Sequence, residues 1–286
     1  MSTSFFLIDA FTDHPFAGNP AGVCLLDAPA PASWMQKVAH EVGASETAFV
    51  IGCEAEQPRL RWFTPTDEVD LCGHATLAAA HALREHAQSD ARQSVSFSTA
   101  SGTLTARYTA AGRITLDFPA DPPVETPLPD GLVEACGVSA PTYTGRSARD
   151  WLIRLDTPGD VQAARPDMEV LARVETRGVI LTAQATGNGT HDFVSRFFAP
   201  RVGVPEDPVT GSAHCALGPY WGRELSTAQL VGRQISARGG TVRIHLPKGP
   251  NGDRVMLTGA CATIVRGQWV AEPTTQDATP PQSSSR

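Results

Sequence analysis

The chain has 286 residues, of which 41% are hydrophobic and 19% charged, a composition typical of a globular protein long enough for two domains. Its formal net charge is −7 and no segment gathers lysines and arginines, which argues against nucleic acid or an anionic membrane as a partner. Residues 1–9 do not resemble a secretory signal, and no stretch reaches the roughly 20 apolar residues of a membrane helix. The 6 cysteines are scattered without CxxC pairs, so we expect reduced thiols in a cytoplasmic protein without structural zinc.

The first half predicts strands interspersed with two helices. We expect strands over residues 5–10, 23–26, 47–51, 60–63, 95–108, with an interruption at Ser101-Gly102, and 114–118. A loop rich in turn-forming residues, 12–20, separates the first two strands. One helix would begin with Ser33 as its cap and end at Gly43, and an Ala- and Leu-rich helix would cover residues 75–87.

The second half repeats this plan after a segment rich in proline and acids, 119–129. We expect strands over residues 151–155, 179–182, 193–198, 234–237, 241–246 and 255–265. Helices are predicted over 161–174, with a kink at Pro166, and over 213–221. The mixture is α+β. We place the domains at 1–118 and 119–261, with a strand near 262–271 returning to the first domain and a disordered tail at 273–286.

A short motif occurs once in each half. Leu71-Cys72-Gly73-His74-Ala75 is matched by Val209-Thr210-Gly211-Ser212-Ala213. The same separation relates Ser98, Gly102 and Thr103 to Ser236, Gly240 and Thr241, and a slightly shorter one relates Arg61, Phe63 and Pro65 to Arg196, Phe198 and Pro200. A register held over three segments indicates a duplicated fold, whose two Gly turns can form one site from two half-sites.

Each Gly turn is predicted to join an extended segment to the start of a helix. A helix N-terminus has unpaired N–H groups and a partial positive charge, which favour a carboxylate or phosphate. Gly73 and Gly211 would let a ligand approach the backbone closely. Either glycine alone could be only a tight turn, but the duplication favours a pair that binds one carboxylate.

Three polar side chains near these turns are candidates for chemistry. Glu46 enters an apolar strand, where a carboxylate suits acid–base catalysis, although a solvated edge residue has the same pattern. His74 begins a predicted helix and suits hydrogen bonding or proton transfer, although it could also be a plain surface histidine. Asp207 could hold a substrate amine or hydroxyl, or simply cap a helix.

Cys72 raises the alternative of a two-base racemase. Such an enzyme needs a base on each face of the reacting carbon, but Thr210 stands at the equivalent place in the second half and Cys215 comes later, on the helix. A single thiol argues against two-thiol racemisation. The segment around Ser212 lacks the G-x-S-x-G pattern of a nucleophile elbow, which argues against a hydrolase.

With these features the chain resembles the PhzF family of phenazine-biosynthesis-like isomerases. The resemblance covers residues from about Phe5 to Val270 and rests on motifs in a fixed order: Phe16-Ala17-Gly18-Asn19-Pro20, Ala44-Ser45-Glu46-Thr47, Phe63-Thr64-Pro65, Asp70-Leu71-Cys72-Gly73-His74-Ala75-Thr76 and Glu206-Asp207-Pro208-Val209-Thr210-Gly211-Ser212-Ala213. It implies the diaminopimelate epimerase fold: two pseudo-symmetric α+β domains, each a mostly antiparallel sheet wrapped around a central helix, with the active site in the cleft between them.

The resemblance also implies roles for particular residues. Glu46 matches the acid/base that moves a proton between two substrate carbons, while His74 and Asp207 match residues that assist orientation and proton transfer. Substrate binding falls to Ser212 with the amides around Gly73 and Gly211, and we add Ser45 and Asn19 from the same motifs. The family implies a homodimer and a reaction without metal or organic cofactor on a small carboxylate such as trans-2,3-dihydro-3-hydroxyanthranilate.

We therefore expect a cofactor-independent isomerase with Glu46 as its one base. Two alternatives stay open: an amino-acid racemase or epimerase that uses Cys72, and a non-catalytic protein that binds a small carboxylate at the two helix termini.

Overall fold

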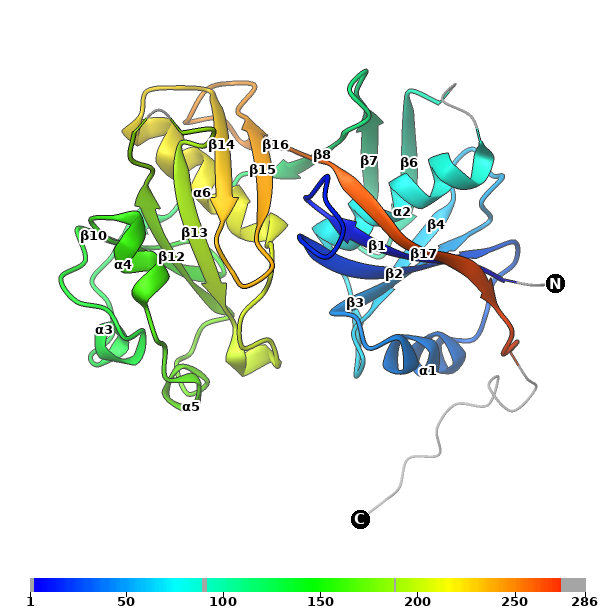
Figure 1. Ribbon diagram of the computed structural model, residues 1–286, viewed down its shortest axis with the longest axis horizontal. Coiled ribbons are helices and arrows are strands. Elements are labelled where there is room, and N and C mark those ends of the chain that lie inside the picture. Colours follow the sequence, from blue (N-terminus) through cyan, green and yellow to red (C-terminus); the bar gives the residue numbers. More distant parts are fainter. Residues whose placement is uncertain (1–2, 89–91, 188, 274–286) are drawn as a thin grey trace, which may run out of the picture. The chain divides into compact units, whose positions relative to one another are not determined.

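The computed structural model describes residues 3–88, 92–187 and 189–273, and these fall into two compact units (Figure 1). The first unit comprises Met1–Phe16, Pro20–Ile114 and Ala260–Arg286, and the second comprises Ala17–Asn19 and Thr115–Gly259. The division at 114/115 lies a few residues before the predicted boundary at 118/119. Beyond residue 273, the predicted tail lies outside the described residues.

Among its described residues, the first unit has two helices, α1 (Ala32–Val42) and α2 (Gly73–Ala87). Its strands are β1 (Thr3–Ala10), β2 (Asn19–Leu26), β3 (Glu46–Ile51), β4 (Arg59–Phe63), β5 (Glu68–Val69), β6 (Ser94–Thr99), β7 (Gly102–Tyr108) and β17 (Cys261–Trp269). Strand β17 pairs antiparallel with β1, so the last strand of the chain belongs to the unit of the first. Strands β2 and β3 are parallel, β3 and β4 antiparallel, β4 and β6 parallel, and β6 and β7 antiparallel.

The second unit contains the long helix α6 (Gly211–Glu224), three short helices and one 3-10 turn. The short elements are α3 (Leu132–Ala135), α4 (Pro158–Ala163), α5 (Met168–Leu171) and η1 (Pro200–Val202). The strands are β8 (Ile114–Pro119), β9 (Val124–Glu125), β10 (Tyr143–Arg146), β11 (Asp150–Arg154), β12 (Gly178–Gln184), β13 (Phe193–Phe198), β14 (Gln229–Gln234), β15 (Gly240–His245) and β16 (Arg254–Gly259).

Strand pairing follows the same order in both units. Strands β11 and β12 are parallel, β12 and β13 antiparallel, β13 and β14 parallel, and β14 and β15 antiparallel, as in the series β2, β3, β4, β6 and β7. Even the register agrees, because Thr47 pairs with Phe63 in the first unit and Val179 pairs with Phe198 in the second. It follows that Gly178 occupies in the second unit the position that Glu46 occupies in the first.

Both long helices are enclosed by the sheet of their own unit (Figure 1). Helix α2 buries every residue from His74 to Leu83 and contacts β1, β3, β7 and β17. Helix α6 is buried from Ala213 to Gly222 and contacts β14, β15 and β16. A helix that is apolar on all sides needs such an enclosure, and this fixes each N-terminus, with its Gly turn, against the sheet.

Helix α1 fixes the position of β3. Its buried stripe includes Trp34 and Val38, which belong to one hydrophobic cluster with Phe49 and Phe63. The rings of Trp34 and Phe49 meet edge to face with centroids 6.1 Å apart. This packing anchors β3 and with it Glu46, the first residue of the strand.

Three predicted boundaries are wrong. Helix α1 begins at Ala32 with Pro31 as its cap, so Ser33 lies inside the helix. The predicted helix 161–174 is two short helices, α4 and α5, because Pro166 lacks an N–H and disfavours helical geometry in the residue before it. The strand predicted over 234–237 ends at Gln234, since Gly239, with φ of 64°, forms a turn in which its N–H donates to Ser236 Oγ.

Candidate active site

In the first unit, Glu46 lies against His74 at the start of α2. The distance between His74 Nε2 and Glu46 Oε2 is 3.3 Å, and that between His74 Nε2 and Ser45 Oγ is also 3.3 Å. The side chain of Glu46 is 20% exposed and that of His74 only 7%. The carboxylate is therefore open to a ligand on one side and held by a nearly buried imidazole on the other.

The other nitrogen of the same imidazole faces a thiol. Cys72 Sγ lies 3.5 Å from His74 Nδ1, and both side chains are buried. Cys72 caps α2, and its carbonyl accepts hydrogen bonds from the hydroxyl and the backbone N–H of Thr76, at 2.6 and 3.1 Å. A thiol, an imidazole and a carboxylate thus form one continuous chain of contacts.

The donor types of this cluster also suit a metal ion. Glu46, Cys72 and His74 each offer one ligand atom, and these atoms lie within 4.8 Å of one another. Carboxylate, thiolate and imidazole are zinc ligands. However, the thiol meets Nδ1 whereas the carboxylate meets Nε2, and one ion binds only one nitrogen of a ring. The contacts therefore fit a hydrogen-bonded chain better than three ligands around one ion.

In the second unit, Asp207 is held from several sides before the start of α6. Its Oδ1 accepts a hydrogen bond from Asn19 Nδ2 at 2.8 Å, and its Oδ2 accepts one from Thr210 Oγ1. Asn19 Nδ2 also donates to the carbonyl of Val209 at 3.0 Å, and the side chain of Gln234 bridges the carbonyl of Asp207 and the N–H of Thr210. Asn19, predicted to bind substrate, therefore has a clear positioning role toward Asp207.

Ser212, the second residue of α6, faces a guanidinium. Arg177 Nη1 donates to Ser212 Oγ at 2.9 Å, and the other side of the same guanidinium forms a two-bonded ion pair with Asp150. Burial raises the pKa of Asp150, and the ion pair with Arg177 opposes that rise. Arg177 keeps 29% of its side chain exposed, whereas Asp150 is 1% exposed, so the positive end of the pair is the accessible one.

Both long helices begin at the glycine that the sequence singles out. Helix α2 starts at Gly73 and α6 at Gly211, and within the described chain neither Cys72 nor Thr210 caps its helix with a side chain. Thr210 instead turns its hydroxyl toward Asp207. The N–H groups of the first turn are thus not occupied by a capping side chain, which suits an anion at either terminus.

The structure brings the predicted residues into two groups. Ser45, Glu46, Gly73 and His74 lie together in the first unit, and Asn19, Asp207, Gly211 and Ser212 belong to the second. Sequence reasoning missed Arg177, Asp150 and Gln234. Arg177 could have been found from the duplication, because it precedes β12 as Ser45 precedes β3.

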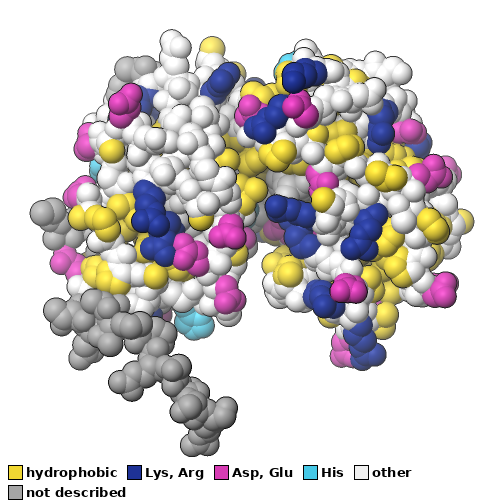
Figure 2. Space-filling view, turned by 180° about the vertical axis from the view of Figure 1, so that it is seen from behind, with side chains coloured by type: hydrophobic (Ala, Val, Ile, Leu, Met, Phe, Trp, Pro, Cys, Tyr) yellow, Lys and Arg dark blue, Asp and Glu magenta, His cyan; other side chains and the backbone are white. Residues whose placement is uncertain are grey.

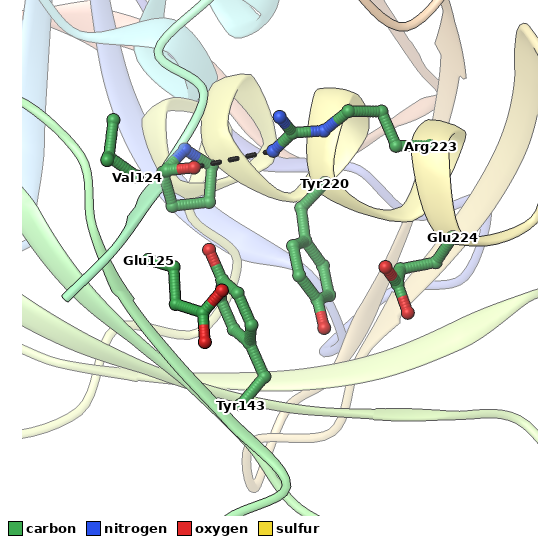
Figure 3. A pocket seen from close by; sticks show the side chains of 7 residues that line it. Val124, Glu125, Tyr143, Tyr220, Arg223 and Glu224 are labelled. Atoms are coloured by element: carbon green, nitrogen blue, oxygen red, sulfur yellow. Dashed lines mark hydrogen bonds between the residues drawn. The ribbon is translucent and has the colours of Figure 1, made fainter. Parts of the chain in front are cut away.

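Two of the cavities in the described residues lie away from Glu46 and Asp207. One, of about 390 Å³, is lined by two tyrosines at the far end of α6 (Figure 3). The other, of about 1040 Å³, is an open groove of the first unit lined by Arg84, Arg92 and Arg107. On the face shown in Figure 2, basic and acidic side chains are interspersed over each unit.

The chain is an α+β isomerase by its similarity to known proteins. Residues 8–267 match the family described as phenazine biosynthesis-like protein, and the chain belongs to this family. It is 45% identical to an uncharacterised isomerase of Halalkalibacterium halodurans, with 94% of this chain and 98% of the relative covered. A phenazine biosynthesis-like domain-containing protein of Rattus norvegicus is 37% identical, with 95% and 100% covered.

Solved structures agree with this assignment. The crystal structure of a PhzF family protein from Enterococcus faecalis has a TM-score of 0.87 at 35% identity, covering 95% of this chain and 100% of the other. A hydroxyproline epimerase from Agrobacterium vitis, with a TM-score of 0.58 at 12% identity, covers 93% of this chain and 92% of its own and shares the fold alone. The described helices include none that is both long and apolar enough to cross a bilayer.

Proposed function

We propose that this isomerase moves a proton between two carbons of a small cyclic or amino carboxylate, with Glu46 as its acid/base and no cofactor. The Glu46 carboxylate removes a proton from one carbon, and the resulting carboxylic acid returns a proton to another. No other reagent is needed, because one carbon loses a proton and the other carbon gains one.

The main support for this proposal is a difference between the two units at the positions equivalent to Glu46 and Cys72. Gly178, which has no side chain, occupies the place of Glu46 in the second unit, and Thr210 occupies the place of Cys72. The second unit therefore lacks a base at either position. A single base suits a proton shuttle, whereas a racemase needs two.

His74 supports Glu46 in this scheme. Where Cys72 donates its proton to Nδ1, the proton of the neutral ring lies on Nε2 and is directed at Glu46 Oε2 and Ser45 Oγ. This hydrogen bond orients the carboxylate that removes the proton.

We propose that the substrate carboxylate is bound by the N-terminal amides of α2 and α6, by Ser212 and by the exposed side of Arg177. A guanidinium and a helix N-terminus both favour a carboxylate. Asp207, fixed by Asn19 and Thr210, then orients a substrate amine or hydroxyl. That groups of both units act on one substrate molecule, and that the enzyme is a cytoplasmic homodimer, are parts of the proposal.

The experiment is an NMR screen in D2O of trans-2,3-dihydro-3-hydroxyanthranilate and a panel of small amino and hydroxy carboxylates. We expect at least one compound to rearrange, with deuterium incorporated at the carbon that receives the proton. A panel member that binds but shows neither rearrangement nor exchange would contradict the proposal for its substrate class.

A racemase that uses Cys72 is the second candidate, favoured by the contact of 3.5 Å between its thiol and His74. It predicts exchange at a stereocentre without movement of a double bond, so the same spectra distinguish the two reactions.

A further inference from the structure

The cavity of about 390 Å³ lies at the C-terminal end of α6, and all of its lining belongs to the second unit (Figure 3). Its lining residues are Pro123, Val124, Glu125, Tyr143, Tyr220, Arg223 and Glu224. Ser212 is at the other end of the same helix, about 16 Å away along an axis that rises about 1.5 Å per residue. The cavity is therefore separate from the candidate active-site groups of this unit.

The body of the cavity is aromatic and uncharged. The rings of Tyr143 and Tyr220 are tilted by 40° with centroids 4.8 Å apart, and Pro123 and the exposed Val124 continue the apolar surface. Burial raises the pKa of both tyrosines, so their phenols are neutral at physiological pH. Concave surfaces of about 300 to 1000 Å³ with apolar walls and few polar groups are the usual form of small-molecule sites.

Three charged side chains complete the lining, and two of opposite sign, Arg223 and Glu125, have bonding capacity left. Arg223 donates one hydrogen bond, to the carbonyl of Pro123 at 3.3 Å, and a guanidinium has five N–H donors. Within the described residues, the Glu125 carboxylate has neither an ion-pair nor a hydrogen-bond partner, whereas Glu224 is paired with Arg154 at 2.5 Å. Figure 3 shows Arg223 and Glu125 reaching the cavity from different elements, α6 and β9.

We propose that this cavity binds a small zwitterion with an apolar body, namely a free amino acid with an aromatic or branched aliphatic side chain. Its carboxylate would bind the spare N–H groups of Arg223, and its ammonium would bind Glu125. The tyrosine faces and the carbonyl end of α6 also favour a cation, and the apolar side chain packs on Pro123 and Val124. This site does not depend on the proposed isomerase reaction.

The probe is L-phenylalanine, titrated into the full chain by calorimetry beside two analogues that each lack one charge, phenethylamine and 3-phenylpropanoate. We expect the zwitterion to bind and each analogue to bind about tenfold more weakly or worse, because each leaves either Arg223 or Glu125 without its oppositely charged partner. Arg223→Gln should weaken phenylalanine and 3-phenylpropanoate but not phenethylamine, and Glu125→Gln should show the reverse preference.

Matched controls are Arg173→Gln and Glu134→Gln, two exposed residues of the same unit outside the cavity. Thermal unfolding of every variant establishes that it is folded. Binding of phenylalanine that persists in Glu46→Gln but is lost in Arg223→Gln would support the cavity. Binding unchanged by both Arg223→Gln and Glu125→Gln, or no binding of phenylalanine at millimolar concentration, would overturn it. Arg223→Gln should still turn over a substrate identified for the enzyme, because the cavity is separate from the candidate active-site groups.

Discussion

Ser212 accepts a hydrogen bond from Arg177 at 2.9 Å, and these two residues repeat in the second unit a contact that His74 and Ser45 make in the first. In each unit, the residue before a central strand, β12 or β3, contacts the second residue of the long helix. The duplicated fold thus keeps the contact and changes its chemistry. The first unit places the Glu46 carboxylate beside this contact, and the second supplies a cation, Arg177, to it.

Arg177 has two roles that a pair of variants can separate. Arg177→Gln removes the partner of the buried Asp150 carboxylate, so we expect a loss of stability on the order of 3 kcal/mol and a raised KM. Adding Asp150→Asn should restore part of the stability but not the KM, because the uncharged pair still lacks a cation for the substrate. Chemical denaturation and steady-state kinetics give the two readouts. If the double variant has the KM of the wild type, Arg177 does not bind the substrate.

A variant of Cys72 tests the racemase alternative. With Glu46 as the one base, Cys72→Ser should lower kcat by less than about tenfold, since it removes a contact of His74 but no base. The control is Cys215→Ser on α6, where burial raises the pKa of the thiol to about 12. Both variants are assayed on the substrate found in the screen. A loss of a thousandfold or more in Cys72→Ser alone would favour thiol catalysis.

His214 makes stability depend on pH. It is fully buried on α6, and burial lowers the pKa of its imidazole to about 4, while the hydrogen bond at Thr210 opposes this shift. An unfolded chain takes up this proton near pH 6.5, but the folded chain does not until about pH 4. Burial of the neutral His214 therefore has its full effect on the free energy of unfolding above pH 6.5. As the pH falls toward 4, the free energy of unfolding decreases by up to roughly 3 kcal/mol.

The measurement is urea unfolding of wild type, His214→Gln and the exposed His245→Gln between those two pH values. We expect the slope of unfolding free energy against pH to become smaller only in His214→Gln. Equal slopes for the wild type and this variant would contradict this, because they would mean that the folded chain binds the His214 proton over the same pH range as the unfolded chain.

Gly178, the counterpart of Glu46, leaves no room for a side chain. A Cβ there would clash with the ring of Phe197 and come within 3.0 Å of the carbonyl of Phe198. Gly178→Ala should therefore destabilise the protein by about 1–3 kcal/mol. Gly267→Ala, where no atom lies within 4 Å of the added carbon, serves as the control in the same thermal unfolding experiment. Equal melting temperatures would mean that β12 can move to accept a side chain.

Much of the fold can be predicted from the sequence, because short motifs that recur in both halves reveal the duplication. Gly73 and Gly211 do begin the two long helices, and the α+β class and the family are confirmed. The Arg177–Asp150 pair could not be predicted, because it depends on the register of β11 against β12. The short strands β5, β9 and β10 were also missed, since two to four residues carry too little periodicity to detect.

In the proposed reaction, Glu46 alone moves the proton. The most direct test is deuterium incorporation from D2O, by NMR, for wild type, Glu46→Gln and the exposed control Glu41→Gln on the same substrate. We predict incorporation in wild type and Glu41→Gln, and a loss of at least about a hundredfold in Glu46→Gln. Incorporation at the wild-type rate in Glu46→Gln would contradict the account and place the base elsewhere.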